Sequence, residues 1–136
     1  MRDRVFFDTN ILIYAYFRTN DEKQEISQQL LHENFAVIST QVLQELCNAM
    51  HKKAKVDYSI IKLIVEECIK NCSKLFINES NTVFKACDIA AQYGFSFYDS
   101  MIIAAALECE CTILYSEDLQ HKQLIDRKLT ILNLFL

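Results

Sequence analysis

The sequence predicts an α/β fold built around a mostly parallel sheet of about five strands. Short apolar runs rich in Val, Ile and Phe are bounded by polar residues, which is typical of strands covered on both faces. Longer stretches with helical periodicity separate these runs, and strands that alternate with helices require the crossover connections of a parallel sheet. The length of 136 residues predicts one domain over residues 1–136.

The predicted strands are the five nearly continuous apolar runs, at residues 5–7, 35–39, 74–77, 112–115 and 129–132. The helices between them are indicated by apolar side chains that recur on one face. These faces comprise Ile26, Leu30 and Leu31; Val42, Leu46 and Ala49; and Ile60, Ile61, Ile64, Val65 and Cys68.

Two further features indicate the later helices. Residues 101–107 are almost wholly apolar, so the helix that contains them is expected to be central. Gly94, the single glycine of the chain, follows a helical stretch at 83–93 and is well placed to end it as a C-cap.

Composition limits the possible functions. The net charge of −4 argues against strong non-specific binding to nucleic acid, but acidic residues around a metal count as negative only until the metal is bound. No apolar run approaches the roughly 18 residues of a membrane span, and the start MRDRVFFD resembles no signal or transit peptide, so no membrane partner and a cytoplasmic location are expected. Because no export signal is recognised, we expect the six cysteines to be buried small apolar residues rather than a disulfide framework.

Four carboxylates fall where a parallel sheet binds ligands, beyond the carboxyl ends of its strands. Asp8 and Asp118 follow predicted strands, Asp99 begins the most apolar helix, and Glu45 lies one turn into another helix. Each has a simpler interpretation, because Asp8 and Asp99 suit helix N-caps, Glu45 suits a helix surface and Asp118 suits a turn.

Convergence of these acids would require a cation. Two carboxylates about 5 Å apart repel by roughly 3 kcal/mol at an effective dielectric near 20. Oxygen ligands without nearby His or Cys favour Mg²⁺ or Mn²⁺ over Zn²⁺. Such ions bridge phosphate oxygens and make a bound water nucleophilic.

The segments DTNIL at 8–12, VLQEL at 42–46, YDSMIIAAA at 98–106 and LYSEDLQH at 114–121 occur in this order. Together they resemble the PIN-domain ribonucleases, particularly the VapC-type toxins of toxin–antitoxin pairs, over residues 5–135. The resemblance implies a three-layer α/β/α sandwich, endonuclease activity on RNA that depends on Mg²⁺ or Mn²⁺, and a cognate antitoxin protein as partner.

Carried over residue by residue, Asp8, Glu45, Asp99 and Asp118 resemble the acidic quartet of this family. The resemblance implies that the three aspartates hold one or two metal ions, with Glu45 as a ligand or as the group that orients the attacking water. Asn10 and Ser116 match supporting positions. Glu117 competes with Asp118 for the last acidic position, and the spacing to Ser116 favours Asp118. Lys122 stands where similar sequences commonly have glycine.

RNA binding needs positive charge, and the densest run is HKKAK at 51–55. Lys52, Lys53, Lys55 and Lys122 are therefore predicted RNA contacts, although lysines at a helix C-terminus also complement the helix dipole. Apolar residues beyond the needs of the core suit a homodimer interface or an antitoxin groove.

Two other functions fit part of the pattern. A phosphoaspartyl phosphatase would use Asp8 as its nucleophile, but it needs a second Asp where this chain has Asn10, and a glycine-rich flap. A non-catalytic PIN-like module for protein interaction is the other alternative, although such modules have usually lost part of the acidic set.

Overall fold

The computed structural model describes residues 3–17 and 20–136. A six-stranded sheet runs through it in the order β3-β2-β1-β4-β6-β5. Neighbouring strands pair in parallel except β5, which is antiparallel to β6. The strands are β1 (Arg4–Phe7), β2 (Phe35–Ser39), β3 (Lys74–Phe76), β4 (Ile113–Tyr115), β5 (Leu124–Ile125) and β6 (Leu129–Leu132).

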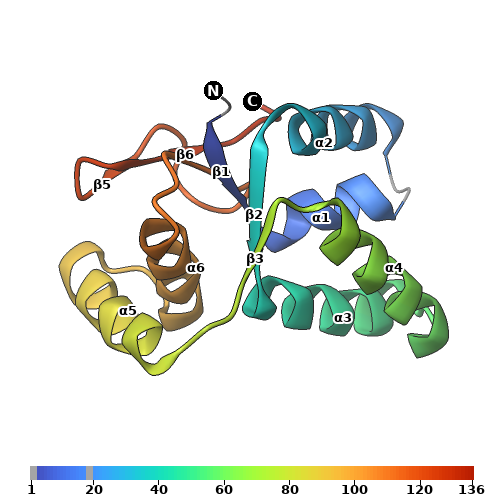
Figure 1. Cartoon of the computed structure of the whole chain (residues 1–136), viewed down its shortest axis with the longest axis horizontal. Coiled ribbons are helices and arrows are strands. Elements are labelled where there is room, and N and C mark those ends of the chain that lie inside the picture. Colours follow the sequence, from blue (N-terminus) through green and yellow to red (C-terminus); the bar gives the residue numbers. More distant parts are fainter. Residues whose placement is uncertain (1–2, 18–19) are drawn as a thin grey trace.

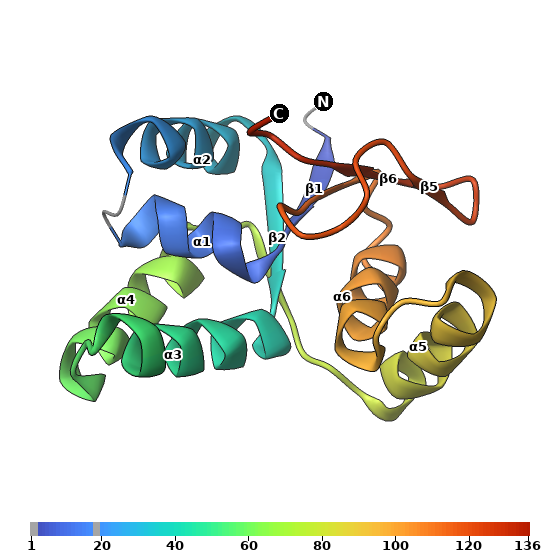
Figure 2. The same cartoon turned by 180° about the vertical axis from the view of Figure 1, so that it is seen from behind.

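Helices cover the sheet on both sides and make the predicted three layers. They are α1 (Thr9–Tyr16), α2 (Asp21–Glu33), α3 (Thr40–Ala54), α4 (Tyr58–Asn71), α5 (Ser80–Tyr93) and α6 (Phe97–Glu108). Figures 1 and 2 show α1 to α4 on one side of the central strands and α5 with α6 on the other. None of the helices in the described part of the chain combines the length and apolar character that a bilayer span requires.

The five predicted strands are all present, and the structure adds β5. This strand has only two residues, Leu124 and Ile125, so it is too short to produce a recognisable apolar run. Antiparallel pairing with β6 follows from the tight turn that joins the two strands.

The core follows the predicted apolar faces with one exception. All residues from Met101 to Ala106 in α6 are buried, as expected of a central helix. Ile61 and Cys68 of α4 are buried, but Ile60 is 50% exposed, so its predicted place on the buried face is wrong. Adjacent residues on a helix point about 100° apart, and here Ile61 faces the core.

The cysteines divide by position and carry free thiols. Cys68, Cys109 and Cys111 are buried as predicted, whereas Cys87 is exposed on α5. Burial raises the pKa of Cys68 and that of Cys111 to about 12, so both behave as small apolar residues.

Turns in this glycine-poor chain place ordinary side chains in the left-handed region. Gly94 is the C-cap of α5 at φ 79°, which confirms the prediction. Lys122 has φ 69°, and this explains why glycine is common at this point in similar sequences. The same conformation occurs at Lys55, Asp126 and Arg127.

The sheet order brings three strand ends together. β1 lies between β2 and β4 and is parallel to both, so all three end at the same edge. The backbone N–H of Asp8 donates to the carbonyl of Tyr115 at 3.0 Å, which joins the ends of β1 and β4. Residues that follow these strands therefore meet at one edge.

Candidate active site

Asp8 is the buried acid at this edge. As the N-cap of α1 it accepts a hydrogen bond from the Thr9 N–H at 2.7 Å, and its other oxygen accepts from Ser116 Oγ at 2.9 Å. Burial, together with the negative charges of Glu45 and Asp99, raises the pKa of Asp8 to about 6 despite these two donors. Asp8 thus interacts electrostatically with both acids.

Glu45 is tied to Asp8 through Thr9. The Thr9 hydroxyl donates to Glu45 Oε1 at 2.6 Å, while the Gln41 amide donates to Glu45 Oε2 at 3.2 Å. The same Gln41 amide donates to the carbonyl of Tyr98 at 3.0 Å, the residue before Asp99. Gln41 therefore joins α3 to the start of α6.

Asp118 is exposed and accepts a hydrogen bond from the Asn10 side chain at 2.9 Å. Its backbone N–H donates to Ser116 Oγ at 3.3 Å, and the same hydroxyl donates to Asp8. Ser116 is fully buried, so it fixes the turn after β4 against the end of β1.

These contacts form one network that includes the side chains of Asp8, Glu45 and Asp118 and reaches the backbone next to Asp99. It runs from the Tyr98–Asp99 segment through Gln41, Glu45, Thr9, Asp8 and Ser116 to Asp118 and Asn10. The predicted N-cap role is confirmed for Asp8 and wrong for Asp99, because the Ser96 hydroxyl caps α6 by accepting from the Asp99 N–H. Asp99 lies in the first turn, where the helix dipole still favours its charge.

Two members of the network were missed in the sequence. Thr9 lies inside DTN, directly after Asp8. Gln41 lies four residues before Glu45 on one helix, which is the spacing at which side chains meet. That spacing was a usable signal for Gln41, whereas no local pattern pairs Thr9 with Glu45, 36 residues away.

Glu117 makes its side-chain contacts outside this network. Its carboxylate forms a salt bridge with Lys23 at 2.7 Å and accepts from the Tyr14 hydroxyl at 2.7 Å. Partial burial raises its pKa, but the hydrogen bonds from Lys23 and Tyr14 outweigh this and hold the pKa of Glu117 below its usual value.

The donor set suits a hard cation, although it is not a closed cage. Among residues 3–17 and 20–136, no three His, Cys, Asp or Glu side chains are grouped tightly enough to hold a metal by themselves. Mg²⁺ commonly takes one or two carboxylates and keeps several waters, so it needs no such cage. Gln41 Oε1 is buried without a partner in the described part of the chain, and it can accept from such a water.

One of the predicted basic residues shares a pocket with the network. Lys53 lines a pocket of about 280 Å³ between α1 and α3, together with Asn10 and Tyr14. Lys52 and Lys55 are exposed at the end of the same helix, and Lys122 is exposed in the loop after β4. RNA contact by these lysines stays a prediction.

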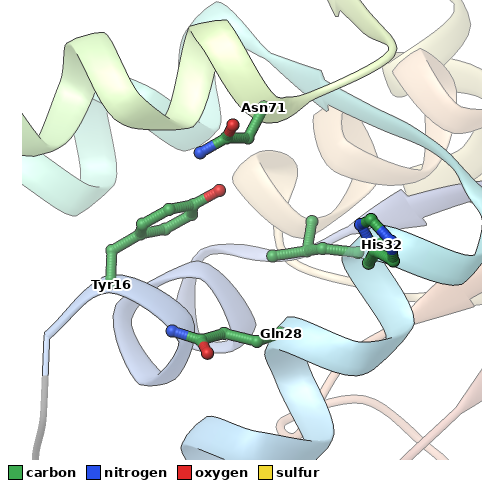
Figure 3. Close-up of a pocket in the computed structure, with 5 residues that line it drawn as sticks. Tyr16, Gln28, His32 and Asn71 are labelled. Atoms are coloured by element: carbon green, nitrogen blue, oxygen red, sulfur yellow. The ribbon is translucent and has the colours of Figure 1, made fainter.

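A second pocket lies apart from the acids. It has a volume of about 250 Å³ and is bordered by Tyr16, Gln28, His32 and Asn71 (Figure 3). Figure 3 shows the Tyr16 hydroxyl pointing toward Asn71. The described residues that line this pocket carry no carboxylate, so it does not extend the acidic site.

The sequence also matches a known domain. The family model of the PIN domain covers residues 5–126. The chain belongs to the PIN domain family. This PIN domain resembles none of the curated protein sequences significantly.

Solved structures share the fold of this PIN domain. VapC20 from Mycobacterium tuberculosis, described as a Sarcin-Ricin loop cleaving toxin, has 11% identity and a TM-score of 0.67, with 81% of this chain and 86% of that one covered. VapBC2 from Rickettsia felis, bound to a promoter DNA fragment, has 19% identity and a TM-score of 0.70 over 96% and 98% of the chains. A toxin–antitoxin complex from Klebsiella pneumoniae has 18% identity and a TM-score of 0.65 over 84% and 86%.

Proposed function

We propose that this PIN domain is a divalent-metal-dependent endoribonuclease and the toxin of a toxin–antitoxin pair. The observation that carries the proposal is the hydrogen-bond network that joins the carboxylates of Asp8, Glu45 and Asp118 at the carboxyl edge of a PIN fold and reaches Tyr98, the residue before Asp99. Acids of this kind, with no basic partner among them in the network, suit a reaction on a phosphodiester through Mg²⁺ or Mn²⁺.

In the proposed site, Asp8, Asp99 and Asp118 hold the metal, and Glu45 is a ligand or orients the attacking water. When bound, the ion lowers the pKa of a water and offsets the charge of the phosphate oxygens. Thr9 and Gln41 each donate to one Glu45 oxygen, which fixes the plane of that carboxylate. Asn10 fixes Asp118 in the same way.

The proposed partners follow from the structural neighbours. The Mycobacterium toxin cleaves the Sarcin-Ricin loop, and the Klebsiella structure is a toxin–antitoxin complex. RNA as substrate and a cognate antitoxin are proposed for this chain by that likeness, and a homodimer is proposed from its exposed apolar surface. Exposed apolar side chains such as Leu63 on α4 and Phe84 on α5 offer surface for a protein partner.

The test is cleavage of total RNA in the presence of Mg²⁺ or Mn²⁺ by the wild-type protein and by Asp8→Asn. Wild type is expected to cut, and Asp8→Asn is expected to lose at least about 100-fold in rate, because the central carboxylate no longer carries charge. Asp88→Asn on α5 makes the same chemical change at an exposed position and is expected to cut like wild type. Full activity in a folded Asp8→Asn protein would exclude the proposed site.

A second experiment on the wild-type protein distinguishes the nuclease from the phosphatase alternative. A phosphoaspartyl enzyme forms a covalent intermediate on its nucleophilic Asp. Beryllofluoride mimics that intermediate, so a stoichiometric adduct on Asp8 would favour the phosphatase. The nuclease proposal predicts no adduct.

A further inference from the structure

We infer that Glu117 is a positioning residue that acts together with Lys23 and Tyr14, and that it is not a metal ligand. The inference rests on the proposed function for its consequence in metal binding. It concerns which of two adjacent residues, Glu117 or Asp118, is the last acid of the proposed metal site. Both have the charge that such a site needs. It also gives a role to two residues outside the acidic motifs.

The Glu117 side chain is fully engaged away from the acids. Lys23 Nζ lies 2.7 Å from Glu117 Oε2, and the Tyr14 hydroxyl lies 2.7 Å from Oε1. Lys23 Nζ also donates to the Tyr14 hydroxyl at 3.3 Å, which closes a triangle of three polar groups. A carboxylate with a strong donor on each oxygen has little reason to turn toward a cation elsewhere.

Aromatic rings hold the lysine in this triangle. Lys23 Nζ lies 4.6 Å from the centre of the Tyr14 ring and 4.8 Å from that of Phe135. The two rings meet edge to face with 5.3 Å between their centres. The cation is therefore placed by two π faces as well as by the carboxylate. Figures 1 and 2 both show the C-terminal segment, which carries Phe135, ending beside α2.

The backbone of Glu117 is fixed as well. Its carbonyl accepts from the Asn133 side chain at 3.3 Å. On one side of it, Ser116 bonds to Asp8, and on the other side Asp118 bonds to Asn10. Glu117 is thus the central residue of a short turn whose neighbours both contact the acidic network.

The arrangement has a direct consequence. Glu117 and Asp118 contact Tyr14 and Asn10, which lie one turn apart on α1, so anchoring Glu117 on α1 and α2 holds the turn where Asp118 reaches Asn10. Without the anchor the turn gains rotational freedom, and Asp118 loses its defined position. We call Lys23, Tyr14 and Glu117 the latch.

The first test needs no metal. Glu117→Gln keeps oxygen and amide groups that can bond Tyr14, whereas Glu117→Ala removes both side-chain contacts of residue 117 in the latch. ¹⁵N-resolved NMR of the metal-free proteins should show wild-type shifts for the Asn10 side-chain amide and the Asp118 and Leu119 backbone amides in the Gln variant. The Ala variant should shift them. Glu66→Ala, an exposed residue on α4, is the control for loss of one glutamate and should leave these signals in place.

The second test is Mn²⁺ affinity, measured from the EPR signal of free Mn²⁺. The latch predicts that Glu117→Gln binds Mn²⁺ within about threefold of wild type and that Glu117→Ala binds roughly tenfold more weakly. Lys23→Gln with Glu117→Gln should bind no more weakly than Glu117→Ala, because both lose the same anchor.

The outcomes separate the two proposals. Loss of Mn²⁺ binding in the Gln variant as complete as in the Ala variant, with unchanged amide shifts, would make Glu117 a ligand and overturn the inference. Unchanged shifts in Glu117→Ala would also overturn it. If wild-type protein binds no Mn²⁺, the proposed nuclease function fails, while the NMR comparison still decides whether the latch positions Asp118.

Discussion

At the scale of a single residue, the surroundings of Asp8 act on the ionisation of its carboxyl group in two opposite directions. Its oxygens accept from Thr9 and Ser116, which favours the charged form, yet burial and two nearby acids favour the neutral form. The second influence is stronger, since the pKa of Asp8 rises from 3.8 to about 6. A carboxylate that is held ionised under such conditions destabilises the metal-free fold and is ready to bind a cation.

This balance predicts a pH dependence of stability. Because the folded-state pKa is raised, the Asp8 contribution to stability is present below about pH 4 and is lost as the pH rises through about 6. The full effect is about 3 kcal/mol, and about half of it falls between roughly pH 5 and pH 8. Urea unfolding in the presence of a chelator should show a smaller decrease in stability over this range for Asp8→Asn than for wild type.

Asp88→Asn again provides the comparison, because this exposed residue should leave the pH dependence as it is in wild type. Equal pH dependence in wild type and Asp8→Asn would mean that Asp8 titrates normally in the folded protein. The electrostatic argument for a cation at this residue would then fail.

At the scale of elements, a chain with a single glycine must place other residues in the left-handed conformation at some helix ends and turns. Gly94 ends α5 at φ 79°, while the turn at 126–128 between β5 and β6 has Asp126 and Arg127 at φ 52° and 56°. Side chains with a Cβ are disfavoured in this region by roughly 1 kcal/mol.

The two positions should therefore respond in opposite directions. Gly94→Ala is expected to destabilise by about 1 kcal/mol, purely through the backbone, because no atom lies within 4 Å of the added Cβ. Arg127→Gly is expected to stabilise by a similar or smaller amount. Thermal unfolding measures both, and Gly94→Asn should be milder than Gly94→Ala because Asn tolerates this conformation. Equal effects of Ala and Asn would contradict the argument.

The elements also show what the sequence can predict. Runs such as 35–39 are apolar up to the terminal Ser39 because both faces of the sheet are covered, so the continuity and length of the run are sufficient to identify the strand. The sequence offers Asp99 as an alternative N-cap of α6, but Ser96 is the cap, because the position depends on where the first turn closes.

The acids of the site were predicted from strand ends, but the contacts that orient them were not. Lys23 and Glu117 are 94 residues apart, and nothing local in either segment indicates the other. Such pairs depend on the sheet order and on how α2 packs against the end of the chain. Local patterns carry no record of this packing.

At the scale of the whole molecule, the proposed function requires an acidic protein to bind an anionic polymer. With 14 basic and 18 acidic residues, the average field repels RNA, so binding must depend on a local group of lysines. Lys53 is the best placed of these because it shares a pocket with Asn10.

Lys52→Glu with Lys53→Glu should therefore weaken RNA binding and flatten its dependence on salt. Each lost phosphate contact reduces the slope of log K against log salt by about 0.7 for single strands. The slope is best measured in the Asp8→Asn background, which prevents cleavage. Lys62→Glu with Lys70→Glu makes the same charge change on α4 and should alter the slope less. Equal changes of the salt slope in the two double variants would show that RNA binding depends on net charge alone.

The outermost strands of the sheet are β3, with three residues, and β5, with two. Such short edges offer a neighbouring chain very few free backbone N–H and C=O groups, so the sheet is a poor template for the addition of further strands. Concentrated protein should therefore resist conversion into fibrils.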